Sequence, residues 1–183
     1  MMPFDELNAL KTQISAVRSA DPEQLKKDAD YFIDEVTDLF VMAYVYGTNE
    51  ASQELGENIE PDLSEMRAVI EEKFDGKNYI DRLGEYFGGG TDYDIARVLD
   101  TDAHRIYNAA LFTAAKKAGA TTKTWNTMAD GRVRDLHDYL EGVTIPIDSA
   151  FYTFNGESAM YPGQFGSAEN DCNCRCFVTF SKL

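Results

Sequence analysis

Apolar residues recur at steps of three and four along the first two-thirds of the chain, which is the spacing of helices that bury one face. Residues 4–18 show this pattern first, and it stops before Asp21. Asp21 and Pro22 then offer a capping carboxylate and a proline in the first turn, so a second, longer helix is expected to begin there. Its predicted buried stripe comprises Leu25, Ala29, Phe32, Val36, Leu39, Ala43 and Tyr46.

Further helices are expected before residue 119. One helix is predicted over residues 60–76 and another over residues 78–87, which the glycines at 88–90 end in a joint or turn. Thr91 and Thr101 are each expected to cap a following helix. The first two-thirds of the chain are therefore predicted to be helical.

The pattern changes after Gly119, where β-branched and aromatic residues gather in short runs separated by turn formers. One short helix is expected between these runs, over residues 133–140. The predicted strands cover residues 121–127, 143–147, 150–154 and 176–180.

These elements predict an α+β protein. An amino-terminal helical region, residues 1–100, is expected to pack on a small carboxy-terminal module of short strands and one helix, residues 101–183. The junction after Gly119 is too short to act as a free linker, so the two parts should pack together.

The net charge of −15 makes the bulk electrostatic field unfavourable for nucleic acid and anionic lipid. Most of this negative charge falls in residues 1–119. The longest apolar run, residues 39–46, is far below the roughly 20 residues that cross a bilayer, so no membrane span is expected. The first twenty residues mix apolar with charged side chains and do not resemble a secretory signal, which predicts a protein that stays in the cytoplasm when made.

Common catalytic fingerprints are absent from the sequence. It contains no phosphate-binding Gly-Lys-Ser/Thr loop, no dinucleotide-binding glycine triplet after a strand and no nucleophile elbow. The histidines are His104 and His137, and neither has a recognisable nucleophile context. The sequence therefore does not predict an enzyme, and it predicts no obligatory cofactor.

A spaced series of polar, glycine and cysteine residues stands out in the carboxy-terminal module. It comprises Trp125, Asp130, Arg132, Arg134, His137, Gly142, Pro162, Gly163, Asn173, Cys174, Arg175 and Cys176. Over residues 101–180 this order resembles the phage Mu F-like head morphogenesis family, whose signature combines an Asp-x-Arg-x-Arg-x-x-His run with Asn-Cys-Arg-Cys before the last strand.

This resemblance implies a minor head protein, present in few copies in the procapsid near the portal vertex. The implied partners are the portal or other capsid proteins, with phage DNA as a further partner during packaging or ejection. The implied location is the virion, after assembly in the host cytoplasm. The acidic helical face would meet a basic surface of the portal or scaffold.

Two other functions compete with this interpretation. Phage-associated toxins, including transferases and nucleases, carry domains that resemble this one. Because the chain stops at Leu183, soon after Cys176, no further effector domain is expected. The second alternative is a nucleic-acid contact that would use Lys123, Arg132, Arg134 and Arg175 as a local phosphate-binding patch.

The cysteines support two interpretations. An odd number packed into five residues does not resemble a disulfide framework, so reduced thiols are expected. On an extended strand, Cys174 and Cys176 would point to one face and Arg175 to the other. They are either small buried core residues or zinc ligands, together with His137 and Cys172.

The charged residues of the signature favour a structural network. Arg132, Arg134 and Arg175 are expected to pair with Asp130, Asp135 and Asp138 and so to orient the strand of Trp125 against the final strand. On the predicted short helix, His137 is spaced to reach Arg134 or Glu141.

Overall fold

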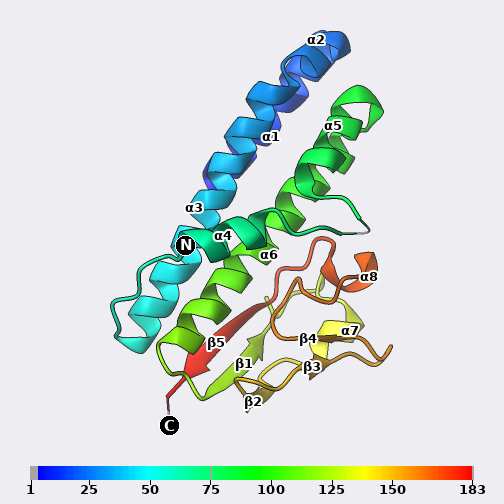
Figure 1. Cartoon of the computed structure of the whole chain (residues 1–183). Helices are drawn as coiled ribbons and strands as arrows, with labels where there is room; N and C mark the ends of the chain where they lie inside the picture. Colours follow the sequence, from blue (N-terminus) through cyan, green and yellow to red (C-terminus); the bar gives the residue numbers. More distant parts are fainter. Residues whose placement is uncertain (1–3, 75, 183) are drawn as a thin grey trace.

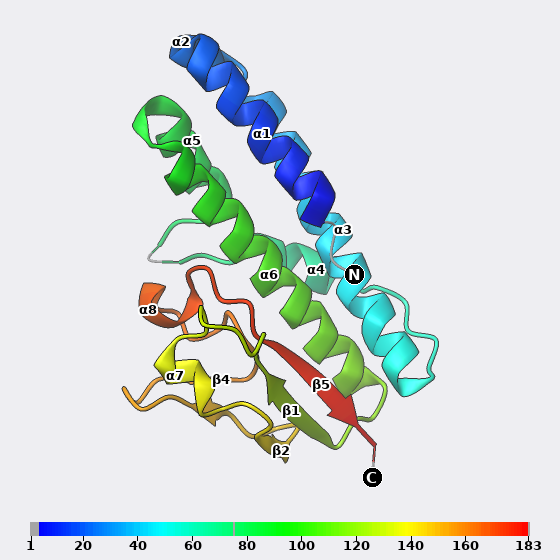
Figure 2. The same ribbon diagram turned by 180° about the vertical axis from the view of Figure 1, so that it is seen from behind.

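The computed structural model describes residues 4–74 and 76–182. Long helices run beside one another, and the strands lie together on one side of them (Figure 1). The two longest helices, α3 and α6, pack along each other, and α6 separates α3 from most of the carboxy-terminal module (Figure 2). The helical part consists of α1 (Phe4–Ala20), α2 (Pro22–Lys27), α3 (Ala29–Leu55), α4 (Leu63–Ile70), α5 (Tyr79–Gly89) and α6 (Asp92–Lys117).

The turn between α1 and α3 follows the capping signal at Asp21. The Asp21 carboxylate accepts a hydrogen bond from the backbone N–H of Glu23, and Pro22 occupies the first turn. The expected single long helix is nevertheless broken at Asp28, where the backbone leaves helical geometry. The side-chain amide of Gln24 donates to the Asp28 carboxylate at the break. The short α2 therefore lets α3 return alongside α1.

The predicted buried stripe, which spans α2 and α3, also differs from the observed one. Leu25, Phe32, Val36 and Ala43 are buried as expected, but Tyr46 is 37% exposed. The observed stripe continues through Phe40, Tyr44, Gly47, Thr48 and Ala51, which face α6 or the other helices. Helices α1, α4, α5 and α6 all contact α3, so more than one of its faces is buried.

Helix α6 is the centre of the molecule. Thr91 caps its start, where the Thr91 hydroxyl oxygen accepts a hydrogen bond from the backbone N–H of Asp94. In return, the Asp94 carboxylate accepts a hydrogen bond from the backbone N–H of Thr91. Thr101 was predicted to cap a separate helix, but it lies inside α6, so the predicted boundary between residues 100 and 101 falls within one continuous helix. All residues from 101 to 111 are buried, because helices pack on one side of α6 and the carboxy-terminal module packs on the other.

Gly47 sets the close approach of α3 to α6. A Cβ atom at Gly47 would lie 2.5 Å from the carbonyl oxygen of Tyr107 and 2.9 Å from Cβ of Ala110. We therefore expect Gly47→Ala to lower the free energy of unfolding by about 1–3 kcal/mol through overpacking. A Cβ atom at Gly84 in α5 would meet no other atom within 4 Å. Gly84→Ala should therefore raise the free energy of unfolding by up to about 1 kcal/mol, because alanine has the higher helix propensity. Urea unfolding measures the stability of both variants. Equal stabilisation by the two changes would contradict a tight contact between Gly47 and α6.

The carboxy-terminal module holds a three-stranded antiparallel sheet in the order β2-β1-β5 and a two-stranded ribbon of β3 and β4. The predicted helix over residues 133–140 is reduced to one turn, α7, and the strand β4 and helix α8 were not predicted. The elements are β1 (Thr122–Asn126), α7 (Asp135–Asp138), β2 (Thr144–Pro146), β3 (Phe151–Tyr152), β4 (Ser158–Ala159), α8 (Ala168–Asp171) and β5 (Phe177–Ser181).

The sheet is attached to the helices through β5, which packs on both α3 and α6. At the outer edge of β5, the backbone N–H of Phe180 donates to the Glu54 carboxylate of α3 at 3.0 Å. The prediction of an α+β fold is confirmed. None of the helices in the described ranges is both long enough and apolar enough to span a bilayer.

Candidate functional site

The structure brings His137, Cys174 and Cys176 together in the interior. His137 comes from α7, and the two cysteines come from the extended segment that leads into β5. The Nδ1 atom of His137 lies 3.6 Å from Sγ of Cys174 and 3.5 Å from Sγ of Cys176. All three residues are buried, so both sulfurs face inward while Arg175 between them points outward.

Aromatic rings hold the imidazole of His137 in place. The ring of Phe165 stacks on it with centroids 5.5 Å apart, and the ring of Trp125 meets it edge-on at 5.3 Å. The Nε2 atom is buried and has no hydrogen-bond partner among the described residues. The predicted neighbours Arg134 and Glu141 do not bind the imidazole, since Glu141 accepts from the backbone N–H of Thr127.

The two thiols influence each other strongly. The contact with the Cys176 thiol, helped by the two nearby histidines, holds the pKa of Cys174 well below its usual range. The same contact and burial raise the pKa of Cys176. All cysteines are free, and Cys172 is only half-buried and lies outside the cluster that His137 forms with the other two.

An ion pair on the outside of the cluster fixes the segment of Arg175. Its guanidinium donates to both carboxylate oxygens of Asp130, at 2.6 and 2.9 Å. These bonds and the backbone N–H of Arg132 hold the pKa of Asp130 well below its usual range. The guanidinium of Arg132 adds a long contact of 3.4 Å to the same carboxylate. This part of the predicted network is present.

Arg134 does not join that network. Its guanidinium donates to the backbone carbonyls of Asn170 and Cys172, the latter at 2.6 Å. No ion pair joins Asp135 or Asp138 to any residue in the described ranges. The prediction that Arg134 pairs with a carboxylate is therefore wrong, because the end of α8 presents carbonyls to it. Arg134 ties the α7 segment to the loop that carries the cysteines.

The remaining residues of the signature shape the backbone. Gly163, with φ of 91°, passes so close to α6 that a Cβ would lie 3.1 Å from Cα of Arg105. The N–H of Gly142 donates to the Trp125 carbonyl at 2.9 Å, and that of Asn173 donates to the Thr101 hydroxyl at 3.2 Å. Pro162 is buried next to Gly163.

Residues on α6 that received no predicted role complete the surroundings of the cluster. Nε2 of His104 lies 2.6 Å from the carbonyl oxygen of Cys176, and the Asn108 amide reaches the same oxygen at 3.3 Å. The spacing of these two residues at i and i+4 was visible in the sequence, but the carbonyl that they share was not.

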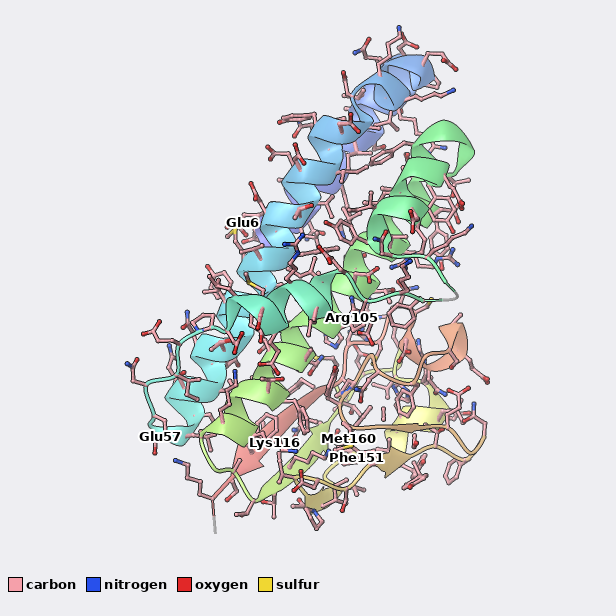
Figure 3. The ribbon with its side chains drawn as sticks, viewed as in Figure 1. Glu6, Glu57, Arg105, Lys116, Phe151 and Met160 are labelled. Atoms are coloured by element: carbon pink, nitrogen blue, oxygen red, sulfur yellow. The ribbon has the colours of Figure 1, made fainter. Side chains whose placement is uncertain are left out.

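An ionic cluster around the buried Arg105 joins α6 to α5 and to the segment that follows α4. Arg105 is 1% exposed and donates to Glu72 at 2.6 Å and to Asp102 at 3.3 Å, while Arg82 donates to Asp102 at 2.7 Å. Figure 3 shows Arg105 where the helices meet the carboxy-terminal module. No pattern in the sequence predicted this cluster beyond the presence of its charges.

The sequence model described as "Phage Mu protein F like protein" matches residues 50–179, which is more than half of the chain. This chain belongs to the phage Mu F-like family. The match begins within α3 and therefore includes α4 and α5, so it extends further toward the amino terminus than the resemblance over residues 101–180.

Two curated relatives of this phage Mu F-like chain carry different descriptions. It is 32% identical over 83 residues to the minor head protein GP7 of Bacillus phage SPP1, which covers 44% of this chain and 27% of that protein. It is 29% identical over 127 residues to the NAD(+)–arginine ADP-ribosyltransferase EFV of Enterococcus faecalis, which covers 59% of this chain and 23% of that enzyme. The chain thus spans only a minor share of each relative. No solved structure matches it significantly.

In this phage Mu F-like chain, Lys123 cannot contribute to a phosphate-binding patch on the surface. It is fully buried on β1, where its ammonium donates to the Met160 carbonyl at 2.8 Å and lies over the rings of Phe112 and Phe151. The labelled side chains of Phe151 and Met160 lie close together in Figure 3. Burial lowers the pKa of Lys123 to about 8.

This lowered pKa predicts an unusual dependence of stability on pH. In the unfolded chain Lys123 keeps its proton up to about pH 10.4. Between about pH 8 and 10 the folded state therefore binds fewer protons than the unfolded state. The contribution of Lys123 to the free energy of unfolding consequently rises with pH through this window. At pH 7 Lys123→Met should raise the free energy of unfolding by about 2 kcal/mol. The change removes the cost of burying a charge, and the loss of the hydrogen bond to the Met160 carbonyl offsets part of this gain. The gain should shrink toward pH 10, as urea unfolding of both proteins at each pH would show. A gain that is the same at both pH values would contradict a buried charge.

Proposed function

We propose that this chain is a minor component of a phage or prophage head, which acts in procapsid assembly next to the portal and is not itself an enzyme. The observation that carries the proposal is the family match over residues 50–179, supported by the similarity to a minor head protein. The proposed partners are the portal or other capsid proteins, and the proposed location is the virion. A role in DNA packaging or ejection would follow from that position.

The surface that best suits such a partner is the acidic face of α3. Asp30, Asp34 and Asp38 follow one another at four-residue steps and are exposed. Within the described residues, none of these three carboxylates forms an ion pair. Uncompensated like charges along one helix destabilise it slightly and gain from a basic partner surface. We therefore assign the contact with a basic face of the portal ring to this part of α3.

Co-sedimentation of the full chain with portal rings from the same genome tests the proposal. Saturable binding is expected. Asp34→Asn with Asp38→Asn should weaken it about 3- to 10-fold at low salt, as the loss of two exposed charge pairs predicts, with a smaller difference at high salt. The matched control is Asp135→Asn with Asp138→Asn, an exposed pair on α7, which should bind as the unchanged chain does.

Two outcomes would overturn parts of this proposal. Absence of binding at any ratio of chain to portal would remove the portal as a partner. Equal weakening by the α3 and α7 variants would show that net charge, and not the α3 face, governs the contact.

The similarity to an ADP-ribosyltransferase does not lead us to propose that activity here. The aligned part is only 23% of that enzyme, so most of the enzyme lies outside the shared region. Incubation of the chain with labelled NAD⁺ and an arginine-rich acceptor protein should transfer no label. Transfer above a heat-inactivated control would reverse the assignment.

Direct DNA binding is also not proposed. Lys123 is buried, Arg134 is used by backbone carbonyls, and Arg175 is paired with Asp130. Of the four predicted contacts, only Arg132 keeps a guanidinium that is largely exposed.

A further inference from the structure

The most unusual side-chain cluster in the protein is the one formed by His137, Cys174 and Cys176. A buried imidazole is normally satisfied by hydrogen bonds to oxygen or nitrogen. Here the contacts to Nδ1 that the structure shows are two sulfurs, which are weak hydrogen-bonding groups. Both sulfurs are also buried, so three soft donor atoms converge where hydrogen bonding alone accounts for them poorly.

The distances between these donors fit a tetrahedral metal ion. With zinc bonds of about 2.0 Å to nitrogen and about 2.3 Å to sulfur, tetrahedral geometry places nitrogen and sulfur about 3.5 Å apart. The observed separations from Nδ1 are 3.6 Å to Cys174 and 3.5 Å to Cys176. All three donor atoms lie within 4.8 Å of one another. An ion could therefore bind without moving the backbone.

The surroundings hold each donor in position. The rings of Trp125 and Phe165 fix the imidazole with Nδ1 toward the sulfurs. The bidentate bond from Arg175 to Asp130 fixes the residue between the two cysteines, so their side chains stay on the inner side. Such prior positioning lowers the cost of binding a metal, because few rotamers remain to be ordered.

The three donor residues line a small cavity, which leaves room for a fourth ligand. It has a volume of about 20 Å³, enough for one water molecule, and its lining includes all three donors together with Met128, Arg132 and Asn173. Two thiolates would balance the charge of Zn²⁺, so that the buried site carries no net charge. Cys172 takes no part in the cluster.

We propose that His137, Cys174 and Cys176 bind one zinc ion, with a water molecule from the adjacent cavity as the fourth ligand. Zn²⁺ displaces the two thiol protons to solvent and bonds to both thiolates and to Nδ1 of the neutral imidazole. Thiolate and imidazole ligands favour zinc over magnesium or calcium. The ion joins α7 to the segment before β5, two parts of the module that are otherwise connected mainly through Arg134 and Arg175.

Metal analysis of the full chain, purified from zinc-supplemented medium without chelators, tests this proposal. One zinc per chain is expected. Cys174→Ser, Cys176→Ser and His137→Ala should each lower the bound zinc at least about 10-fold, in line with loss of a ligand. Cys172→Ser is the matched control, because it removes a neighbouring thiol from outside the cluster, and it should keep the zinc of the unchanged chain.

A second measurement on the unchanged chain does not depend on whether the variants fold. Zinc removed by a chelator is replaced with Co²⁺, which should give the thiolate-to-cobalt absorption band and the intense visible bands of a tetrahedral site. Less than about a tenth of an equivalent of zinc together with no cobalt spectrum would overturn the proposal. A disulfide between Cys174 and Cys176, seen as a mass lower by two hydrogens, would also overturn it. The same holds if Cys172→Ser loses the zinc and the three ligand variants keep it.

Discussion

Trp125→Ala is expected to lower the free energy of unfolding by about 3–5 kcal/mol, the largest effect of a single side chain in the carboxy-terminal module. The indole is fully buried on β1 and contacts the rings of His137, Phe151 and Phe165. Its removal leaves a cavity between the sheet and the loops. Urea unfolding followed by far-ultraviolet circular dichroism measures the loss, since Trp125 is the single tryptophan and fluorescence would disappear with it.

Two further variants make this prediction sharper. Trp125→Phe should cost less than the alanine change, because a ring remains and the buried indole N–H, which lacks a partner among the described residues, is removed. Tyr152→Ala, at an aromatic side chain that is 65% exposed, should change stability by less than about 0.5 kcal/mol. A cost for Trp125→Ala no greater than that of Tyr152→Ala would show that the module is not packed around the indole.

Arg105→Met is expected to cost about 3 kcal/mol or more, although methionine preserves much of the side-chain volume. The substitution removes the donor to the Val69 carbonyl and to Glu72, and it leaves Asp102, which is 1% exposed, with Arg82 as its remaining cationic partner. A buried carboxylate that loses one of two partners carries a large desolvation cost. Thermal unfolding at neutral pH should show a clearly lower midpoint.

The control for this change is Arg97→Met on the same helix. Arg97 pairs with Asp94 at 3.6 Å and is one-third exposed, so its loss should cost less than about 1 kcal/mol. Adding Asp102→Asn to Arg105→Met should recover part of the stability, because the buried negative charge disappears. Equal costs for Arg97→Met and Arg105→Met would mean that the buried cluster contributes no more than a surface ion pair.

The sequence predicted those helix ends that depend on residues close to them in the chain. The cap at Asp21, the start of α5 near Asn78 and the cap at Thr91 are examples, since each is a side chain bonded to the next turn of its own helix. Thr101 resembles these caps in sequence. Its hydroxyl instead accepts from the backbone of Asn173, which is 72 residues away. Only the tertiary fold decides between the two uses.

The composition of the candidate site was partly visible in the same way. Alternation along an extended segment correctly placed Cys174 and Cys176 opposite Arg175. Asp130 and Arg175 both belonged to the predicted ion-pair network, and the structure shows that they bind each other. The partners of Arg134 are carbonyls exposed by the end of α8, a one-turn helix that no pattern predicted. The burial of Lys123 likewise depends on residues 151–161, which include β3 and β4 and fold over β1.

The pairing of β1 with β5 has a consequence for synthesis on the ribosome. Trp125 of β1 lies opposite Val178 of β5. The sheet contacts α3 and α6 through β5. The helices can pack as soon as α6 has left the exit tunnel, whereas β1 must wait for more than fifty further residues before its second neighbour is made. During that interval the nascent chain exposes the apolar face of β1, so interrupted translation would release a product with a formed helical part and an unpaired strand, the kind of intermediate that chaperones and proteases recognise.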